Sequence, residues 1–138
     1  MRENWPDVVT PSTELMMRIY RLNDLVRENA IRQTEQSGLS FTEFEVLVAL
    51  RSVKPPHELI PTDLYQAILI SSGGLTKVLR ALEERGLIAR ARGETDRRSK
   101  PVRLTAAGKN LAERVMPRVL ESDEKLLSEV SAWLRWNG

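Results

Sequence analysis

Apolar residues recur at helical spacing along most of this chain, and the ends of these stretches carry capping or helix-breaking residues. The first stretch predicts a long helix over residues 10–36, with Gly38 as its stop. A second helix is expected to begin at Ser40, because Ser40 and Glu43 have the spacing of a capping box, and to end before a Pro-Pro pair. The N-terminal part of the chain is therefore expected to be helical.

Two shorter helices are expected in the middle of the chain. Residues 57–60 form a brief apolar stretch that suits a very short strand, and Pro61 then opens a short helix. The residues of that helix expected to face inward are Leu64, Ala67 and Ile68. The next helix is expected to run from Ser71, as its N-terminal cap, to Gly86 as its stop. Its apolar stripe consists of Leu75, Val78, Leu79 and Leu82.

The hydrophobic period then changes from that of a helix to that of a strand. Residues 87–92 and 101–104 predict two short strands, joined by the polar and charged segment 93–100 as a long hairpin tip. Thr105 is expected to cap a long C-terminal helix in which Pro117 predicts a kink. The pattern predicts a mostly α-helical domain with a small β-hairpin. Two short helices followed by a charged hairpin are typical of a winged helix-turn-helix.

Positive charge is concentrated in the middle of the chain. The formal net charge is only +2, but residues 71–104 carry nine basic and four acidic side chains, whereas residues 1–70 carry a net charge of −3 and residues 105–138 are neutral. A basic stripe in a near-neutral chain is expected of a surface that contacts nucleic acid. On charge alone, a solvated polar face explains the block equally well.

The residues that most catalytic or metal sites require are scarce. The chain of 138 residues has no cysteine and one histidine, His57, which excludes disulfides, thiolate ligands and cysteine nucleophiles and disfavours a zinc site. No paired inward carboxylates indicate acid–base catalysis. The longest apolar stretches are too short for a bilayer, and the N-terminus lacks the apolar core of a signal peptide. We therefore expect a cytoplasmic protein without enzymatic activity, cofactor, metal or membrane association.

The helix that begins near Ser71 carries the residues that best suit DNA contact. The face opposite its apolar stripe combines small and hydroxyl-bearing residues at the N-terminal end with two basic residues further on. Small residues let the backbone approach DNA closely, and the helix N-terminus favours phosphate. Lys and Arg can reach base edges or phosphates in the major groove. The predicted contact residues are Ser71, Ser72, Gly73, Thr76, Lys77 and Arg80.

The hairpin tip is the second candidate contact. It is too polar to pack in a core, and Arg97, Arg98 and Lys100 can reach a minor groove, whose negative potential attracts arginine. Asp96 is expected to accept hydrogen bonds from an arginine and so fix the tip. An isolated loop of this kind is more often a solvated turn, but its place beside a helix-turn-helix favours contact with DNA. Double-stranded DNA is therefore the predicted partner.

Residues 40–115 resemble the MarR family of bacterial regulators. The resemblance is carried by three ordered segments, LEERGLIAR at 82–90, DRR at 96–98 and VRLTAAG at 102–108. It implies a winged helix-turn-helix whose N- and C-terminal helices interlock in a homodimer that reads a pseudo-palindromic DNA site. It also implies that a small molecule binds between the dimerisation and DNA-binding parts and releases the DNA.

The resemblance also implies a division of the chain. Residues 1–138 would form a single MarR-like domain, in which segments 1–38 and 105–138 supply the dimerisation helices. Segment 40–104 would form the winged helix-turn-helix that contacts DNA. The function that this implies is a ligand-responsive repressor.

A narrower resemblance points to the urate-responsive branch of this family. It is carried by the segments PPHELIPTDL and SSGGLT and by the N-terminal extension. That branch, as the resemblance implies, uses a tryptophan, an aspartate and two arginines for its ligand. Trp5 and Arg90 match two of these positions, whereas Glu45 stands in place of the aspartate and Val78 in place of the other arginine. Because a missing guanidinium removes an anion donor, a related anion or another aromatic acid fits as well as urate.

Two other classes of protein stay open at the level of sequence. A winged helix can instead dock a protein, although such a module has no need for a basic wing beside Lys77 and Arg80. A small enzyme would require convergent acid–base or nucleophilic groups. The sequence favours the DNA-binding regulator over both.

Overall fold

The computed structural model describes residues 2–68, 72–90 and 100–137, without the side chains of Ser72, Trp133, Leu134, Trp136 and Asn137. Its helices are η1 (Pro6–Val8), α1 (Pro11–Gln36), α2 (Phe41–Ser52), α3 (Pro61–Ile68), α4 (Ser72–Glu84) and α5 (Ala106–Asn137). Its strands are β1 (Glu58–Leu59), β2 (Ile88–Arg90) and β3 (Val102–Leu104), which form an antiparallel sheet in the order β1-β3-β2. The predicted class, mostly α with a small β-hairpin, is confirmed.

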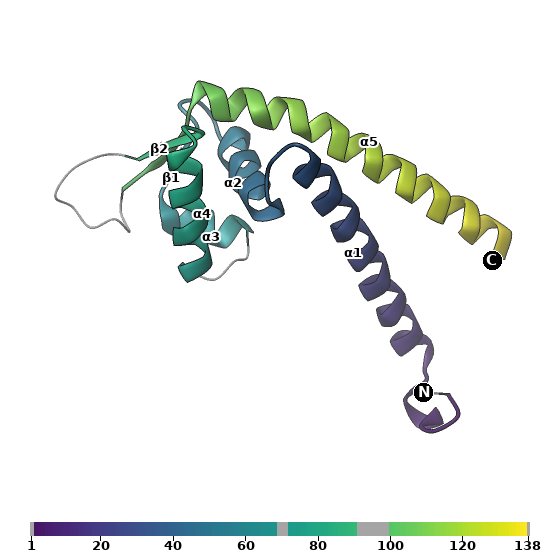
Figure 1. Ribbon diagram of the computed structural model, residues 1–138. Coiled ribbons are helices and arrows are strands. Elements are labelled where there is room, and N and C mark those ends of the chain that lie inside the picture. Colours follow the sequence, from purple (N-terminus) through teal and green to yellow (C-terminus); the bar gives the residue numbers. More distant parts are fainter. Residues whose placement is uncertain (1, 69–71, 91–99, 138) are drawn as a thin grey trace.

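Two long helices extend from a winged part formed by α2, α3, α4 and the sheet (Figure 1). α5 continues through Pro117 as one helix, so the proline does not end it. A polar contact holds α1 to α5: Nδ2 of Asn29 donates to Oδ1 of Asp123 at 3.2 Å, and the Ser122 hydroxyl donates to Oδ1 of Asn29 at 2.8 Å. Because Asn29 is buried, losing these partners would leave a desolvated amide and destabilise the contact between the two helices.

The core lies where α2 meets α3, α4, α5 and the sheet. Its most deeply buried side chains include Leu47, Leu50, Leu64, Leu82, Val102 and Val115. The predicted apolar stripe of α4 is confirmed, except that Val78 is only partly buried. The prediction for α3 is wrong at Ala67, which is exposed. Ala67 lies instead on the wall of an open cavity.

Side-chain caps set the helix ends at the predicted places. At the start of α2, Oγ of Ser40 accepts from the Glu43 amide at 3.1 Å, and Oε1 of Glu43 accepts from the Ser40 amide at 2.9 Å. At the start of α5, Oγ1 of Thr105 accepts from the Gly108 amide at 3.1 Å and donates to the carbonyl of Gly86 at 2.7 Å. Thr105 therefore caps α5 and also ties it to the chain that leaves α4.

Candidate nucleic-acid interface and adjoining cavity

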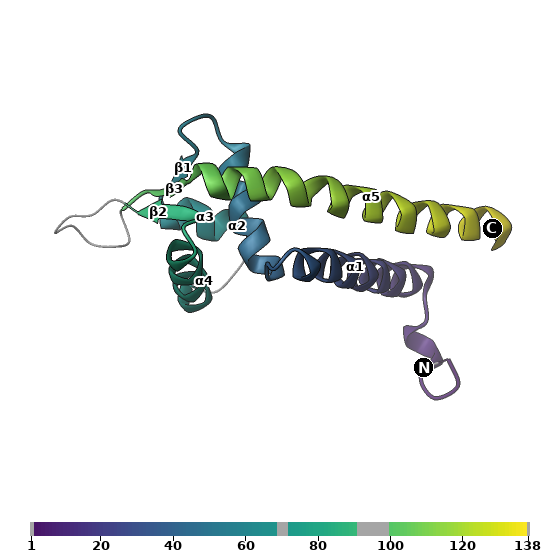
Figure 2. The same cartoon turned by 45° about the horizontal axis from the view of Figure 1, so that its top comes forward.

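The predicted contact face of α4 is open to solvent. Four of the residues expected on this face are exposed, namely Gly73, Thr76, Lys77 and Arg80. The leucines of the opposite face lie in the core. α4 and the β2–β3 hairpin lie at the end of the molecule away from the two chain termini (Figures 1 and 2). This arrangement presents a helix and a hairpin at the same end, as a winged helix does when it binds DNA.

The first turn of α4 leaves room for a close approach. A Cβ atom added to Gly73 would meet no atom within 4 Å, so the space beside the helix is open. The amide groups of a first helical turn suit the binding of phosphate. Ser72 begins the helix. Ser71 and the tip residues Asp96, Arg97 and Arg98 lie outside the described residues, and their roles stay predictions.

Two arginines of the basic block form ion pairs within the protein. Nη1 of Arg85, directly after α4, lies 3.3 Å from Oε2 of Glu43 in α2. Nη2 of Arg103 lies 2.5 Å from Oε1 of Glu58, across the β1–β3 pair. These arginines join neighbouring elements of the winged part, so part of the charge of the basic block has a structural role.

Lys77 and Arg80 differ from these two arginines. Both are exposed, and neither forms an ion pair with another residue in the described parts of the chain. A cation without an acidic partner keeps its full charge for a phosphate or a base edge. Lys100, close to the start of β3, is half-buried at the base of the hairpin. The strongest described candidates for DNA contact are therefore on α4.

The residues predicted to bind an effector are spread over the molecule. Trp5 precedes α1 and is 63% exposed, whereas Glu45 lies in α2, beyond the other end of α1 (Figure 1). A helix of 26 residues is about 39 Å long, so Trp5 does not reach Glu45 within one chain. Arg90 ends β2 and is half-buried. Glu45 lies on the wall of a cavity in the winged part whose described lining includes neither Trp5 nor Arg90.

This cavity, of about 520 Å³, lies between α2, α3 and α5. Its apolar wall includes Phe41, Phe44, Val48, Ile68, Met116 and Val119. Three carboxylates also line the cavity, Glu45 from α2, Asp63 from α3 and Asp123 from α5. Sequence reasoning identified Glu45 but missed the two aspartates. No local signal could have found them, because periodicity and motifs do not connect residues on three separate helices.

The carboxyl of Glu45 is affected by its burial and by one cation. Burial raises the pKa of this carboxyl, and the charge of Arg27 in α1 acts in the opposite direction. The Arg27 guanidinium lies 5.1 Å from the centroid of the Phe41 ring, which forms part of the cavity wall. Glu45 is therefore a partly desolvated acid on a mostly apolar surface.

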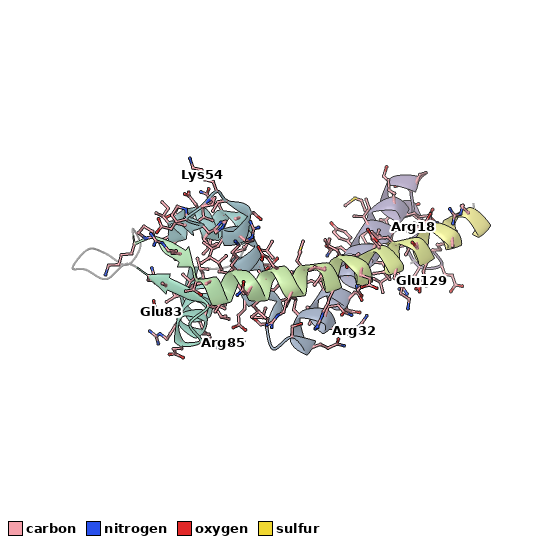
Figure 3. The ribbon with its side chains drawn as sticks, turned by 90° about the horizontal axis from the view of Figure 1, so that it is seen from above. Arg18, Arg32, Lys54, Glu83, Arg85 and Glu129 are labelled. Carbon is pink, nitrogen blue, oxygen red and sulfur yellow. The ribbon has the colours of Figure 1, made fainter. Side chains whose placement is uncertain are left out.

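The acidic residues of the described segments are not arranged as a metal site. Within residues 2–68, 72–90 and 100–137, no group of three or more His, Asp or Glu side chains could hold a metal ion. A search of the same residues found no helix long and apolar enough to cross a membrane. Both long helices carry charged side chains along their length, for example Arg18 and Arg32 on α1 and Glu129 on α5 (Figure 3).

Comparison with known proteins relates most of the chain to regulators of transcription. A model described as MarR family matches residues 37–99. The HTH-type transcriptional regulator PecS of Dickeya dadantii is 29% identical over 130 residues, which cover 94% of this chain and 78% of PecS. The HTH-type transcriptional repressor Rv2887 of Mycobacterium tuberculosis is 30% identical over 114 residues, which cover 83% of this chain and 80% of the repressor.

Solved structures show the same fold. The crystal structure of Rv2887, described as a MarR family protein, superposes with a TM-score of 0.70 and 26% identity over 89% of this chain and 86% of its own. That of Sco3205, a MarR family regulator from Streptomyces coelicolor solved in complex with DNA, superposes with a TM-score of 0.71 and 22% identity over 92% and 88% of the two chains. These relatives are regulators rather than enzymes. This chain belongs to the MarR family of HTH-type transcriptional regulators.

Proposed function

We propose that this chain represses transcription by binding a pseudo-palindromic DNA site as a homodimer, with α4 of each protomer in the major groove and segment 93–100 at the minor groove. The observation that carries the proposal is the exposed face of α4, on which Lys77 and Arg80 have no acidic partner among the described residues. A helix with a small-residue N-terminus and outward cations fits the major groove. Regulation at the chromosome is consistent with a cytoplasmic location.

The proposed homodimer is supported by the apolar surface of the two long helices. The exposed large apolar residues of the N-terminal half of α1 are Leu15, Met16, Met17, Ile19 and Tyr20, and those among the described side chains of α5 are Leu120 and Leu127. Contiguous apolar patches on a protein surface mark interaction sites. A two-fold dimer would bury the same patch on each copy and hold two winged parts at a fixed spacing that matches two half-sites.

Replacing Ile19 with serine is expected to raise the dissociation constant of the dimer by about 30-fold, because each copy loses about 1 kcal/mol of apolar burial and the two-fold interface contains two copies. The Ile19 side chain is 56% exposed in the single chain, so folding of the protomer should be little affected. Sedimentation over a concentration series measures the constant. Tyr65→Ser, at an exposed apolar residue on α3, is the matched control. Equal constants for both variants would place the dimer interface elsewhere.

DNA binding is tested by fluorescence anisotropy with the duplex upstream of this protein's own gene, titrated over a range of salt concentrations. The proposal predicts binding that resists competitor DNA and weakens steeply as salt increases, because phosphate contacts release counterions. A different outcome would be binding no tighter than to random DNA at every salt concentration, both for this duplex and for a library of genomic fragments. That outcome would favour a winged helix that docks a protein instead.

Replacing Arg98 with alanine is expected to weaken binding to specific and random DNA alike. Loss of one phosphate contact per protomer should also reduce the slope of the logarithm of affinity against the logarithm of salt concentration by about 1 for each protomer. The anisotropy titration on both duplexes measures this slope. Unchanged affinity at every salt concentration would show that the hairpin tip does not contact DNA.

The cavity between α2, α3 and α5 supports control by a small molecule. An occupant would touch the winged part and one of the proposed dimerisation helices at the same time. A ligand that binds one arrangement of these parts more tightly shifts the population toward that arrangement, and DNA is released if the favoured spacing no longer fits. The resemblance to the urate-responsive branch at Trp5 and Arg90, two residues that do not line this cavity, suggests a urate-like anion or an aromatic acid. Urate and simple aromatic acids therefore belong in the anisotropy assay.

A further inference from the structure

We propose that the cavity between α2, α3 and α5 binds an organic cation with a flat apolar body, and not the anion suggested by the sequence pattern. The inference builds on the proposed function in treating this cavity as the effector site. Binding of a small molecule to the cavity can nevertheless be measured on the protein without DNA, so the two can fail separately.

The apolar part of the wall suits an aromatic body. Phe41 and Phe44 supply rings, and Val48, Ile68 and Met116 supply aliphatic and thioether surface. Pockets that bind small organic molecules have volumes of about 300–1,000 Å³ and are lined mostly by such side chains with a few polar groups. A cavity of about 520 Å³ lies within this range.

The charged part of the wall is entirely acidic. Glu45, Asp63 and Asp123 reach it from three different helices, and none of the described residues that line the cavity is basic. An anion placed there would lose its hydration and gain no cationic partner, whereas a cation would gain up to three. Because these carboxylates do not form a group that could hold a metal ion, their charge surrounds a space for an organic ligand rather than a divalent cation.

Arg27 does not reverse this preference. Its charge acts on Glu45 and its guanidinium lies over the Phe41 ring, but Arg27 is not among the residues that line the cavity. Burial raises the pKa of Glu45 by more than the charge of Arg27 lowers it. A bound cation would stabilise the ionised carboxylate, whereas a bound anion would disfavour it.

Asp123 connects this cavity to the long helices. One oxygen of Asp123 accepts the hydrogen bond from buried Asn29 of α1, and the same side chain lines the cavity. A cation that approaches Asp123 would compete for the carboxylate with the amide of Asn29. Binding of a cation in the cavity would therefore weaken the Asn29–Asp123 hydrogen bond, which positions α1 against α5.

The test uses three probes with the same aromatic body and different charges: 2-naphthylmethylammonium, 2-naphthylmethanol and 2-naphthoate. The 138-residue protein is labelled at its methionine methyl groups, of which there are four, and Met116 is the one among the described methionines that lines the cavity. We expect the ammonium to shift the Met116 methyl resonance with a dissociation constant about tenfold lower than that of the carboxylate, with the alcohol between them. The resonances of Met16 and Met17 on α1 should not move.

Two variants and one control identify the source of the preference. Glu45→Gln and Asp63→Asn should each weaken binding of the ammonium by about fivefold and leave binding of the alcohol within about twofold, because they remove charge and little volume. Glu121→Gln removes the same charge from an exposed position of α5 outside the cavity and should have no such effect. The melting temperature of each variant confirms that it folds.

Tighter binding of the carboxylate, equal binding of the three probes, or failure of all three to move the Met116 resonance would overturn the inference. So would equal losses in the control and in the two cavity variants. Operator binding is measured on the same samples. Operator binding with a preference for the carboxylate would refute this inference alone. A preference for the ammonium without specific DNA binding would refute the proposed function alone.

Discussion

Replacing Lys77 and Arg80 together with alanine is expected to reduce the affinity of the dimer for its operator by about a thousandfold or more. Each outward cation that reaches a base edge or a phosphate contributes about 1–3 kcal/mol, and the two-fold dimer loses four of them. Both side chains are exposed on α4 and form no ion pair with the other described residues, so their removal leaves no internal charge unpaired. The stability of the protein should therefore change little.

Fluorescence anisotropy with operator and random duplexes measures this effect and separates its two parts. Loss of base contacts lowers the preference for the operator, whereas loss of phosphate contacts lowers both affinities and reduces the salt slope. The control is the double variant Arg114→Ala and Arg118→Ala, which removes the same charge from exposed positions of α5. If the control loses as much affinity as the α4 variant, the effect is one of net charge and α4 does not read the operator.

Replacing Gly108 with alanine is expected to destabilise the protein by about 3 kcal/mol or more, a large share of the stability of a domain this size. Gly108 lies in the first turn of α5, packed against the chain that follows α4. An added Cβ atom would overlap the backbone carbonyl of Leu87 and lie 2.8 Å from Cδ1 of Leu104. The Leu87 carbonyl also accepts from the Thr105 amide at 3.2 Å, so it cannot move without disturbing the start of α5.

Thermal unfolding at a fixed protein concentration checks this prediction, since the melting temperature of an associating protein depends on concentration. The expected loss corresponds to a decrease of about 10 °C. Gly73→Ala is the matched control, because its added Cβ meets no atom within 4 Å and alanine favours a helix, so stability should stay equal or increase by up to about 1 kcal/mol. Similar melting temperatures for both variants would show that α5 can move away from Leu87 at little cost.

Much of the secondary structure could be predicted because its causes are local. Three helix ends are set by residues within one helical turn. They are the capping box at Ser40, the proline that begins α3 and the stop of α4 at Gly86. Gly86 has a φ of 70°, the left-handed conformation that glycine adopts readily at the end of a helix. Ala67 was assigned to the inside by the same reasoning and is exposed, since periodicity shows which face a residue is on but not whether another element covers it.

The charge of the basic block illustrates a second limit. The sequence placed Arg85 and Arg103 in the same positive segment as Lys77 and Arg80. Only the fold showed that Arg85 pairs with Glu43 and that Arg103 pairs with Glu58. Whether a basic residue is paired within the protein or free to contact DNA depends on which acidic residues lie near it. The packing of α2 and β1 places Glu43 and Glu58 beside Arg85 and Arg103.

The sequence by itself determined the order of the elements and the basic face of α4, because both depend on spacing within one helix or one motif. The candidacy of Glu45 came from the resemblance to the urate-responsive branch of the MarR family. Only the tertiary structure decided what surrounds Glu45: Asp63 and Asp123 face the same cavity, whereas Trp5 lies beyond the far end of α1. The three carboxylates face one cavity because α2 packs against α3 and α5. Residues far apart in the sequence meet there through buried apolar contacts, which no periodicity along the chain records.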